Sequence, residues 1–199
     1  MTKKNQLGIL ALCSLIICTL LTACSSGSVT QKTQGTVTKE AVTKVNAFEM
    51  YNKVSIGMTK DKVDASLGVT GEADTNKMAA KDSYNYMDKD HKYGVYIVFD
   101  DKLQVMSKTE IYDTIAVLAP LTVKPVTEAQ ADKITYQMPY TEVVSILGGE
   151  GVECSKTALA GDYNKCGIIR RWGNKDGSGV QVVFNSDDKA GLGALFIRP

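Results

Sequence analysis

The sequence predicts an α+β protein of two tandem helix-helix-antiparallel-sheet repeats, with the helices packed on one sheet face. Two observations lead to this fold class. The first is an internal repeat, and the second is a change of hydrophobic periodicity, from helical to strand-like, within each copy. Runs of helices followed by runs of strands are typical of α+β domains.

The internal repeat rests on two matches that occur in the same order. The segment 53–59 (KVSIGMT) aligns with 133–139 (KITYQMP), 80 residues later, and keeps Lys, a β-branched residue, a hydroxyl residue and Met in register. The segment 94–99 (GVYIVF) aligns with 179–184 (GVQVVF), 85 residues later. Agreement of this extent indicates a tandem repeat whose second copy has the longer connecting loop.

Each copy is expected to begin with two short helices. In the first copy, the apolar residues of 47–54 recur at helical spacing, and Thr59 is a suitable N-cap for a second helix that ends at Gly68. In the second copy, Pro139 stands at the corresponding start and Gly148 at the corresponding end. Two leucines at matching positions are expected to be core residues, namely Leu67 and Leu147.

Strands are expected to follow the helices in both copies. In the first copy they are predicted over 93–99 and 103–111, with a turn at the two aspartates between them. In the second copy they are predicted over 168–172, 180–184 and 194–197.

Aromatic residues on these strands are candidate contacts for a protein partner. Alternation along 93–99 directs Phe99 to the core and Tyr96 to the open face, and Phe184 takes the place of Phe99 in the second copy. Exposed Tyr and Trp residues suit protein recognition, so Tyr96 and Trp172 are the candidates. Cross-strand packing that only stabilises the sheet is the alternative.

The first 24 residues resemble a bacterial lipoprotein signal. Lys3 and Lys4 precede an uncharged run from 7 to 23, and the segment 21–24 (LTAC) is similar to the lipobox that signal peptidase cuts before a cysteine. The resemblance implies that Cys24 becomes the lipidated N-terminus, with acyl chains such as palmitate holding the protein in the cell membrane on its extracytoplasmic face. An uncleaved membrane anchor is the alternative.

A polar segment separates this signal from the repeats. It is rich in Ser, Thr, Gly and Gln, and such a composition cannot bury enough apolar surface to offset the entropy of ordering. The predicted organisation is therefore a lipoprotein signal peptide (1–23), a flexible tether (24–46), a first repeat (47–118), a linker with two prolines (119–126) and a second repeat (127–199).

Two cysteines remain in the body of the exported chain. Cys13 and Cys18 leave with the signal peptide and Cys24 is modified, so Cys154 and Cys166 form an even pair in an oxidising compartment. This predicts a disulfide bond between them. Two reduced thiols are the alternative.

The helix motif of the first copy resembles a known signature. The string 56–59 (IGMT), followed by Val63 and the pair 67–68 (LG), is similar to the Gly-Met-Thr helix signature of the secreted β-lactamase inhibitory proteins and of the small lipoprotein subunit of the outer-membrane β-barrel assembly machinery. The tandem layout and the cysteine pair after the second helix favour the inhibitory proteins. Two tandem repeats of the inhibitory type are thus expected.

The resemblance implies a protein-binding role. In the inhibitory proteins the concave sheet face binds an enzyme, and an acidic residue of a hairpin loop enters its active site. The matching turns here would hold Asp88 or Asp90 in the first copy and Asp176 in the second. Ordinary turn chemistry is the alternative for these aspartates.

Composition excludes some functions. The formal net charge of +1 argues against a nucleic-acid binder, and a single histidine argues against multi-histidine metal sites. No nucleophile with a base and no phosphate-binding loop is evident, so neither an enzyme, a cofactor nor a metal is expected. We expect a non-enzymatic lipoprotein that binds an unidentified protein, or else a structural accessory of cell-envelope assembly.

Overall fold

A computed structural model describes residues 48–75, 82–159 and 162–199. All of them belong to one of the two units into which the chain divides, residues 34–199. The predicted signal peptide, the predicted lipidation site Cys24 and the predicted tether lie outside the described residues.

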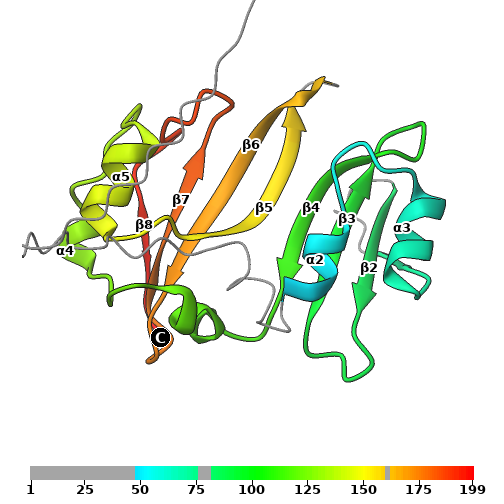
Figure 1. Cartoon of the computed structure of the whole chain (residues 1–199), viewed down its shortest axis with the longest axis horizontal. Helices are drawn as coiled ribbons and strands as arrows, with labels where there is room; N and C mark the ends of the chain where they lie inside the picture. Colours follow the sequence, from blue (N-terminus) through cyan, green and yellow to red (C-terminus); the bar gives the residue numbers. More distant parts are fainter. Residues whose placement is uncertain (1–47, 76–81, 160–161) are drawn as a thin grey trace, which may run out of the picture. The chain divides into compact units, whose positions relative to one another are not determined.

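The described chain has short helices and a larger number of strands (Figure 1). The helical segments are α2 (Glu49–Lys53), α3 (Lys60–Leu67), the 3-10 helix η2 (Ile115–Leu121), α4 (Glu128–Ala131) and α5 (Tyr140–Leu147). The strands are β1 (Glu72–Ala73), β2 (Ser83–Met87), β3 (Gly94–Phe99), β4 (Val105–Ile111), β5 (Val152–Leu159), β6 (Asp162–Gly173), β7 (Gly179–Phe184) and β8 (Leu195–Ile197).

The strands form a single eight-stranded sheet in sequence order, and every neighbouring pair is antiparallel. Strands β4 and β5, which come from different copies of the repeat, are joined by three residue pairs. We call this pairing the seam: Ser107 faces Thr157, Lys108 faces Lys156 and Thr109 faces Ser155. The seam makes one sheet from the two copies.

The predicted α+β class is therefore wrong. The described chain is mostly one eight-stranded antiparallel sheet with few short helices, not an α+β arrangement of two helix-helix-sheet units. The longest α-helices, α3 and α5, have only eight residues each. Most of the backbone hydrogen bonding that orders the two halves comes from strand pairing.

Three strands were not expected from the sequence, and each lacks a regular alternation. In β5, the pairing register shifts between Glu153 and Ser155, and this bulge breaks the period of two on which strand prediction depends. In β2, the buried positions are separated by two half-buried ones, and β1 has only two exposed residues. The segment between the two cysteines is the hairpin of β5 and β6.

Several local predictions are confirmed. The second helix of each copy begins directly after Thr59 or Pro139 and ends before a glycine with left-handed backbone, Gly68 at φ +69° and Gly148 at φ +79°. The Thr59 side chain does not cap α3, however, and Thr59 instead forms an isolated antiparallel bridge with Gln104.

The core has two clusters. One joins buried residues of α2, α3 and β2 to β4 with η2 and the start of β5, and the other joins α4 and α5 with β6 and β7. The side of the sheet with Val95, Ile97 and Phe99 is called the core face, and the opposite side is called the open face. As expected, Phe99 and Phe184 are buried on the core face.

The segment predicted as a linker (119–126) is structured. It begins within η2, and it supplies Leu121 to the first cluster. Val126 belongs to the second cluster, where its backbone N–H donates to the Asn174 side chain. The segment thus attaches to both cores.

Among the described residues, no helix combines the length and apolar character needed to cross a bilayer.

The two leucines expected in the core differ in burial, and this predicts different effects of truncation. Leu147 is 1% exposed, whereas Leu67 is only partly buried at the edge of its cluster. We expect Leu147→Ala to lower the free energy of unfolding by about 2–5 kcal/mol. Leu67→Ala is expected to cost less, as measured by urea denaturation, and equal losses would contradict the assigned burial.

Candidate functional site

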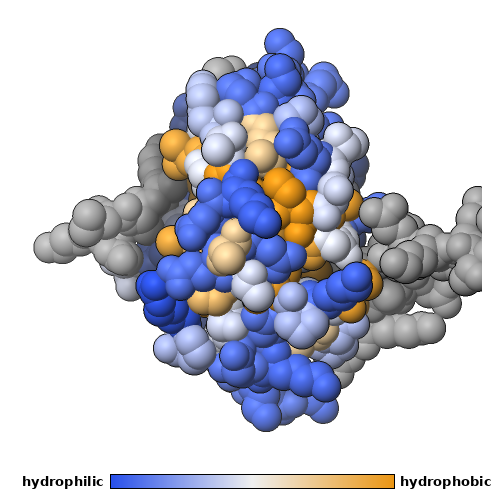
Figure 2. Space-filling view, turned by 90° about the vertical axis from the view of Figure 1, so that its left-hand side faces the viewer, coloured by the Kyte–Doolittle hydropathy of each residue, from blue (hydrophilic) through white to orange (hydrophobic). Residues whose placement is uncertain are grey.

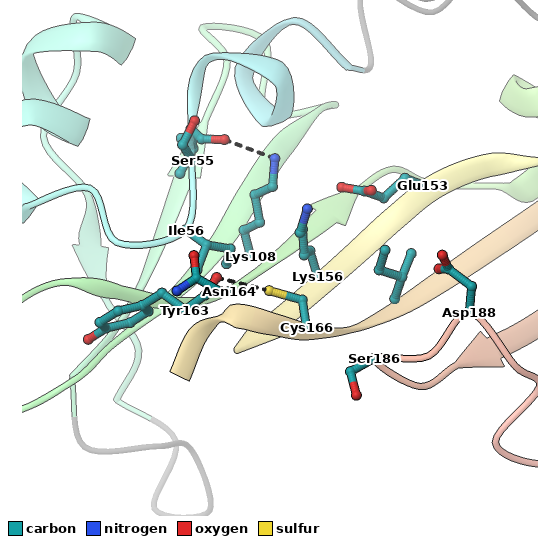
Figure 3. A pocket seen from close by; sticks show the side chains of 12 residues that line it. Ser55, Ile56, Lys108, Glu153, Lys156, Tyr163, Asn164, Cys166, Ser186 and Asp188 are labelled. Atoms are coloured by element: carbon teal, nitrogen blue, oxygen red, sulfur yellow. Dashed lines mark hydrogen bonds between the residues drawn. The ribbon is translucent and has the colours of Figure 1, made fainter. Parts of the chain in front are cut away.

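The candidate site is a groove on the core face beside the seam (Figure 3). Two cavities of about 410 and 450 Å³ share four lining residues, so they form one groove, which we call the seam groove. Its floor comes from β4, β5 and β6, one wall from the segment that follows α2, and the other from the turn after β7. The shared residues are Val54, Ser55, Lys108 and Glu153.

Lys108 attaches the end of α2 to the floor of the groove. Its side chain is only 7% exposed, and its Nζ donates to the backbone oxygens of Tyr51 at 3.1 Å and Val54 at 2.9 Å. The same Nζ lies 3.8 Å from the centre of the Tyr51 ring. A cation is favourable at a helix C-terminus, yet burial lowers the pKa of Lys108 to about 8.

Tyr51 connects α2 to the second half of the chain. Its hydroxyl donates to the Glu153 carboxylate on β5 at 2.9 Å, across the seam. Burial raises the pKa of Tyr51, and the neighbouring Glu153 carboxylate raises it further. The hydroxyl therefore remains a donor at neutral pH.

The carboxyl group of Glu110 is buried without a hydrogen-bond partner among the described residues. The residue is 5% exposed, and both of its carboxyl oxygens are buried. Burial raises the pKa of Glu110 to about 9, although the nearby Lys108 acts in the opposite direction. The carboxyl is thus protonated at neutral pH, because burying it as an anion would cost more.

The sequence did not identify this charged cluster. Lys108 and Glu110 alternate with Ser107 and Thr109 along β4, so no apolar residue in that stretch indicates which face is buried. One signal for the cluster was present in the sequence. Lys108 and Glu110 are two residues apart in a predicted strand, so their side chains were expected to lie on the same face of the sheet.

On the open face, Tyr96 lies as the alternation predicted. It is half-buried and belongs to a row of paired residues that crosses six strands, from β2 to β7. We call these residues the open-face row: Asn85, Tyr96, Thr109, Ser155, Ile169 and Val183. At the seam, the hydroxyls of Thr109 and Ser155 are hydrogen-bonded at 2.9 Å.

Trp172, predicted as a partner contact, lies in the core. It is 1% exposed, and its Nε1 donates to the backbone oxygen of Gly149 at 2.8 Å. Its ring packs over Gly151, where a Cβ atom would lie 2.5 Å from the ring. Trp172 therefore cannot contact a partner in this fold, and its role is to close the second core.

The two candidate aspartates lie in separate turns. Asp90 is exposed in the β2–β3 turn, where Asp88 accepts the backbone N–H groups of Lys92 and Tyr93. Asp176 accepts from the backbone N–H and the hydroxyl of Ser178, and these hydrogen bonds lower the pKa of Asp176. The observed role of Asp176 is to order the β6–β7 turn.

The predicted disulfide is absent, since Cys154 and Cys166 are both free thiols. Cys166 faces Ala158 in the β5–β6 pairing, and Cys154 lies four residues from Ala158 along β5. Four residues of a strand span about 13 Å, well beyond the separation that a disulfide bridges. An even pair of cysteines in the sequence predicted the bond, whereas the long β5–β6 hairpin separates the two thiols.

Apolar side chains also gather on the side of the molecule shown in Figure 2, with hydrophilic residues around them. In the second half of the chain, the segments 134–138 and 189–193 run together, joined by hydrogen bonds between Gln137 and Ala190 and between Ala190 and Met138. The large exposed apolar residues of this part of the chain are Tyr136, Leu192 and Leu195.

No group of three or more His, Cys, Asp or Glu side chains within the described ranges could hold a metal ion. Comparison of the chain with protein-family models and with curated proteins finds no match. Functional inference therefore rests on the groove, the open face and the sequence motifs.

The burial of Glu110 predicts how stability depends on pH. The unfolded chain ionises this carboxyl near pH 4.5, whereas the folded chain keeps it protonated up to about pH 9. The unfolded state therefore binds fewer protons across this window, and Glu110 makes stability fall as pH rises. The slope from one proton is at most about 1.4 kcal/mol per pH unit.

Glu110→Gln should flatten this dependence between pH 5 and pH 8, a window below the Lys108 pKa of about 8. Urea denaturation at several pH values measures the effect, with the exposed Glu142→Gln as control. An unchanged slope in Glu110→Gln would show that the carboxyl is not buried as described.

Proposed function

We propose that this chain is a membrane-anchored extracytoplasmic lipoprotein that binds another protein through the open face of its sheet, without catalysing a reaction. The continuity of the sheet across the seam carries the proposal. Because β4 pairs with β5, the open-face row runs without interruption from the first half of the chain into the second. A partner could therefore contact both halves at once.

The composition of the open-face row suits protein recognition. Tyr96, Ile169 and Val183 offer partly exposed apolar area, and Asn85 and Thr109 offer hydrogen-bonding groups beside it. Tyr supplies a large contact area with few rotatable bonds and a polar hydroxyl, which suits it to interfaces. The resemblance of the helix motif to that of the β-lactamase inhibitory proteins supports the same class of function.

Membrane anchoring is supported by the sequence motif that ends at Cys24. We expect Cys24→Ser to abolish lipid attachment and processing, because the thiol is the acceptor of the lipid. Membrane fractionation and mass measurement of the exported protein test this. Unchanged processing and full membrane retention of the variant would contradict the lipoprotein assignment.

Partner binding should depend on Tyr96. We expect Tyr96→Lys to weaken capture of the partner from cell-envelope extracts by about tenfold or more, since it places a charge in the open-face row. Tyr136→Lys is the matched control, because Tyr136 is 68% exposed and lies outside that row.

Equal capture by Tyr96→Lys and Tyr136→Lys would contradict binding through the open face. Capture of one soluble enzyme would indicate an inhibitor-like role. Recovery of a membrane complex would instead indicate a structural accessory of envelope assembly.

A further inference from the structure

The floor of the seam groove contains an unusual row of residues. Across β2 to β7 the core-face row reads Tyr84, Ile97, Lys108, Lys156, Ile168 and Phe184. Two lysines directly facing each other thus stand at the centre of a row that is otherwise apolar or aromatic. Like charges opposite each other on neighbouring strands are destabilising. Lys108 is explained by its contacts with α2, whereas no contact within the described fold explains the charge of Lys156 beside it.

The ammonium groups of the two lysines differ in whether they are free to bind a ligand. The Nζ of Lys108 is engaged by two backbone oxygens and the Tyr51 ring, so it contributes positive potential rather than a contact. Lys156 is half-buried, and its Nζ has no hydrogen-bond or ion-pair partner among the described residues. Arg170, the remaining cation of the groove lining, is engaged by two backbone oxygens and by the Tyr140 ring. The ammonium group of Lys156 is thus the free cation on the described floor of the groove.

The acidic residues that line the groove, Glu150, Glu153 and Asp188, form no ion pair with Lys156 in the part of the chain that the structure describes. Glu153 already accepts the Tyr51 hydroxyl, and none of the ion pairs in the described chain includes Glu153 or Lys156. Asp188 belongs to the opposite wall, on the turn after β7 (Figure 3). An anionic group of a ligand would therefore lie beside Lys156 and away from Asp188.

The rest of the lining fits a peptide better than a small free anion. The half-buried Ile56 and Ile168 provide apolar surface, and Ser55 and Asn164 provide neutral hydrogen-bonding groups. The two joined cavities extend the groove along the sheet. This combination suits an acidic side chain flanked by apolar residues on an extended segment.

We infer that the seam groove binds an acidic, extended peptide segment of a protein partner, with a carboxylate of that segment paired to Lys156. Lys108 strengthens the interaction by its charge, and the apolar wall holds the flanking residues. The groove lies on the core face, opposite Tyr96, so this site is separate from the open-face interaction and does not depend on it.

Fluorescence polarisation of a labelled, blocked peptide of alternating Glu and Val tests this inference. The full chain is kept in a neutral detergent, and the peptide with Gln in place of Glu is compared. We expect the Glu peptide to bind, and Lys156→Gln to weaken it about tenfold, the loss of one charge-assisted hydrogen bond. Lys165→Gln, an exposed lysine of β6, is the matched control and should change binding less than about twofold.

Three outcomes would overturn the inference. They are no binding of the Glu peptide at millimolar concentration, equal binding of the Glu and Gln peptides, and equal loss in Lys156→Gln and Lys165→Gln. Free glutarate distinguishes the source of the carboxylate, since competition by glutarate as strong as that by unlabelled peptide would indicate a small-anion site. Because Lys156 is half-buried and unpaired, circular dichroism of Lys156→Gln should match that of the parent chain.

Discussion

Three residue pairs between β4 and β5 join the two halves of this chain. These pairs make one eight-stranded sheet from two copies of a repeat. On the open face, two hydroxyl pairs are hydrogen-bonded across the seam: Ser107 with Thr157, 2.7 Å apart, and Thr109 with Ser155. On the core face the same pairing brings Lys108 and Lys156 together and forms the floor of the seam groove. Without the seam there is neither a continuous open face nor a groove.

The polar contacts beneath the seam hold neighbouring elements in place, but the burial of their polar groups costs stability. The Tyr51 hydroxyl reaches Glu153 across the seam, and at the other end Tyr163 of β6 donates to the Asp100 side chain in the turn after β3. Lys108 holds α2 in place but does so as a buried cation, and Glu110 has no partner among the described residues. Buried polar groups of this kind cost free energy, which is why their concentration at one junction marks it as a candidate for function.

Features that depend on neighbouring residues, such as helix ends, could be predicted from the sequence. Features that depend on which strands pair, such as the fold class, could not. Gly68 and Gly148 marked helix ends correctly, because a left-handed C-cap depends on the local backbone. The fold class failed because β5 has a bulge at Glu153 and Ser155 that hides its alternation, and the pairing of β4 with β5 is not encoded in either strand alone. The same hidden hairpin separated Cys154 from Cys166. Trp172 appeared exposed because aromatic type alone does not indicate whether a strand position faces the core.

A cross-link across the seam tests the continuous sheet most directly. Ser107→Cys with Thr157→Cys, in a chain where Cys154 and Cys166 are replaced by Ala, should form a disulfide under mild oxidation, since the native hydroxyls lie 2.7 Å apart. Thr109→Cys with Thr157→Cys is the control, because Thr109 faces Ser155 and is two residues out of register. Rapid closure of the first pair only, found by peptide mapping, is the result predicted by the seam. Failure of the first pair to close, or equal closure of both pairs, would contradict it.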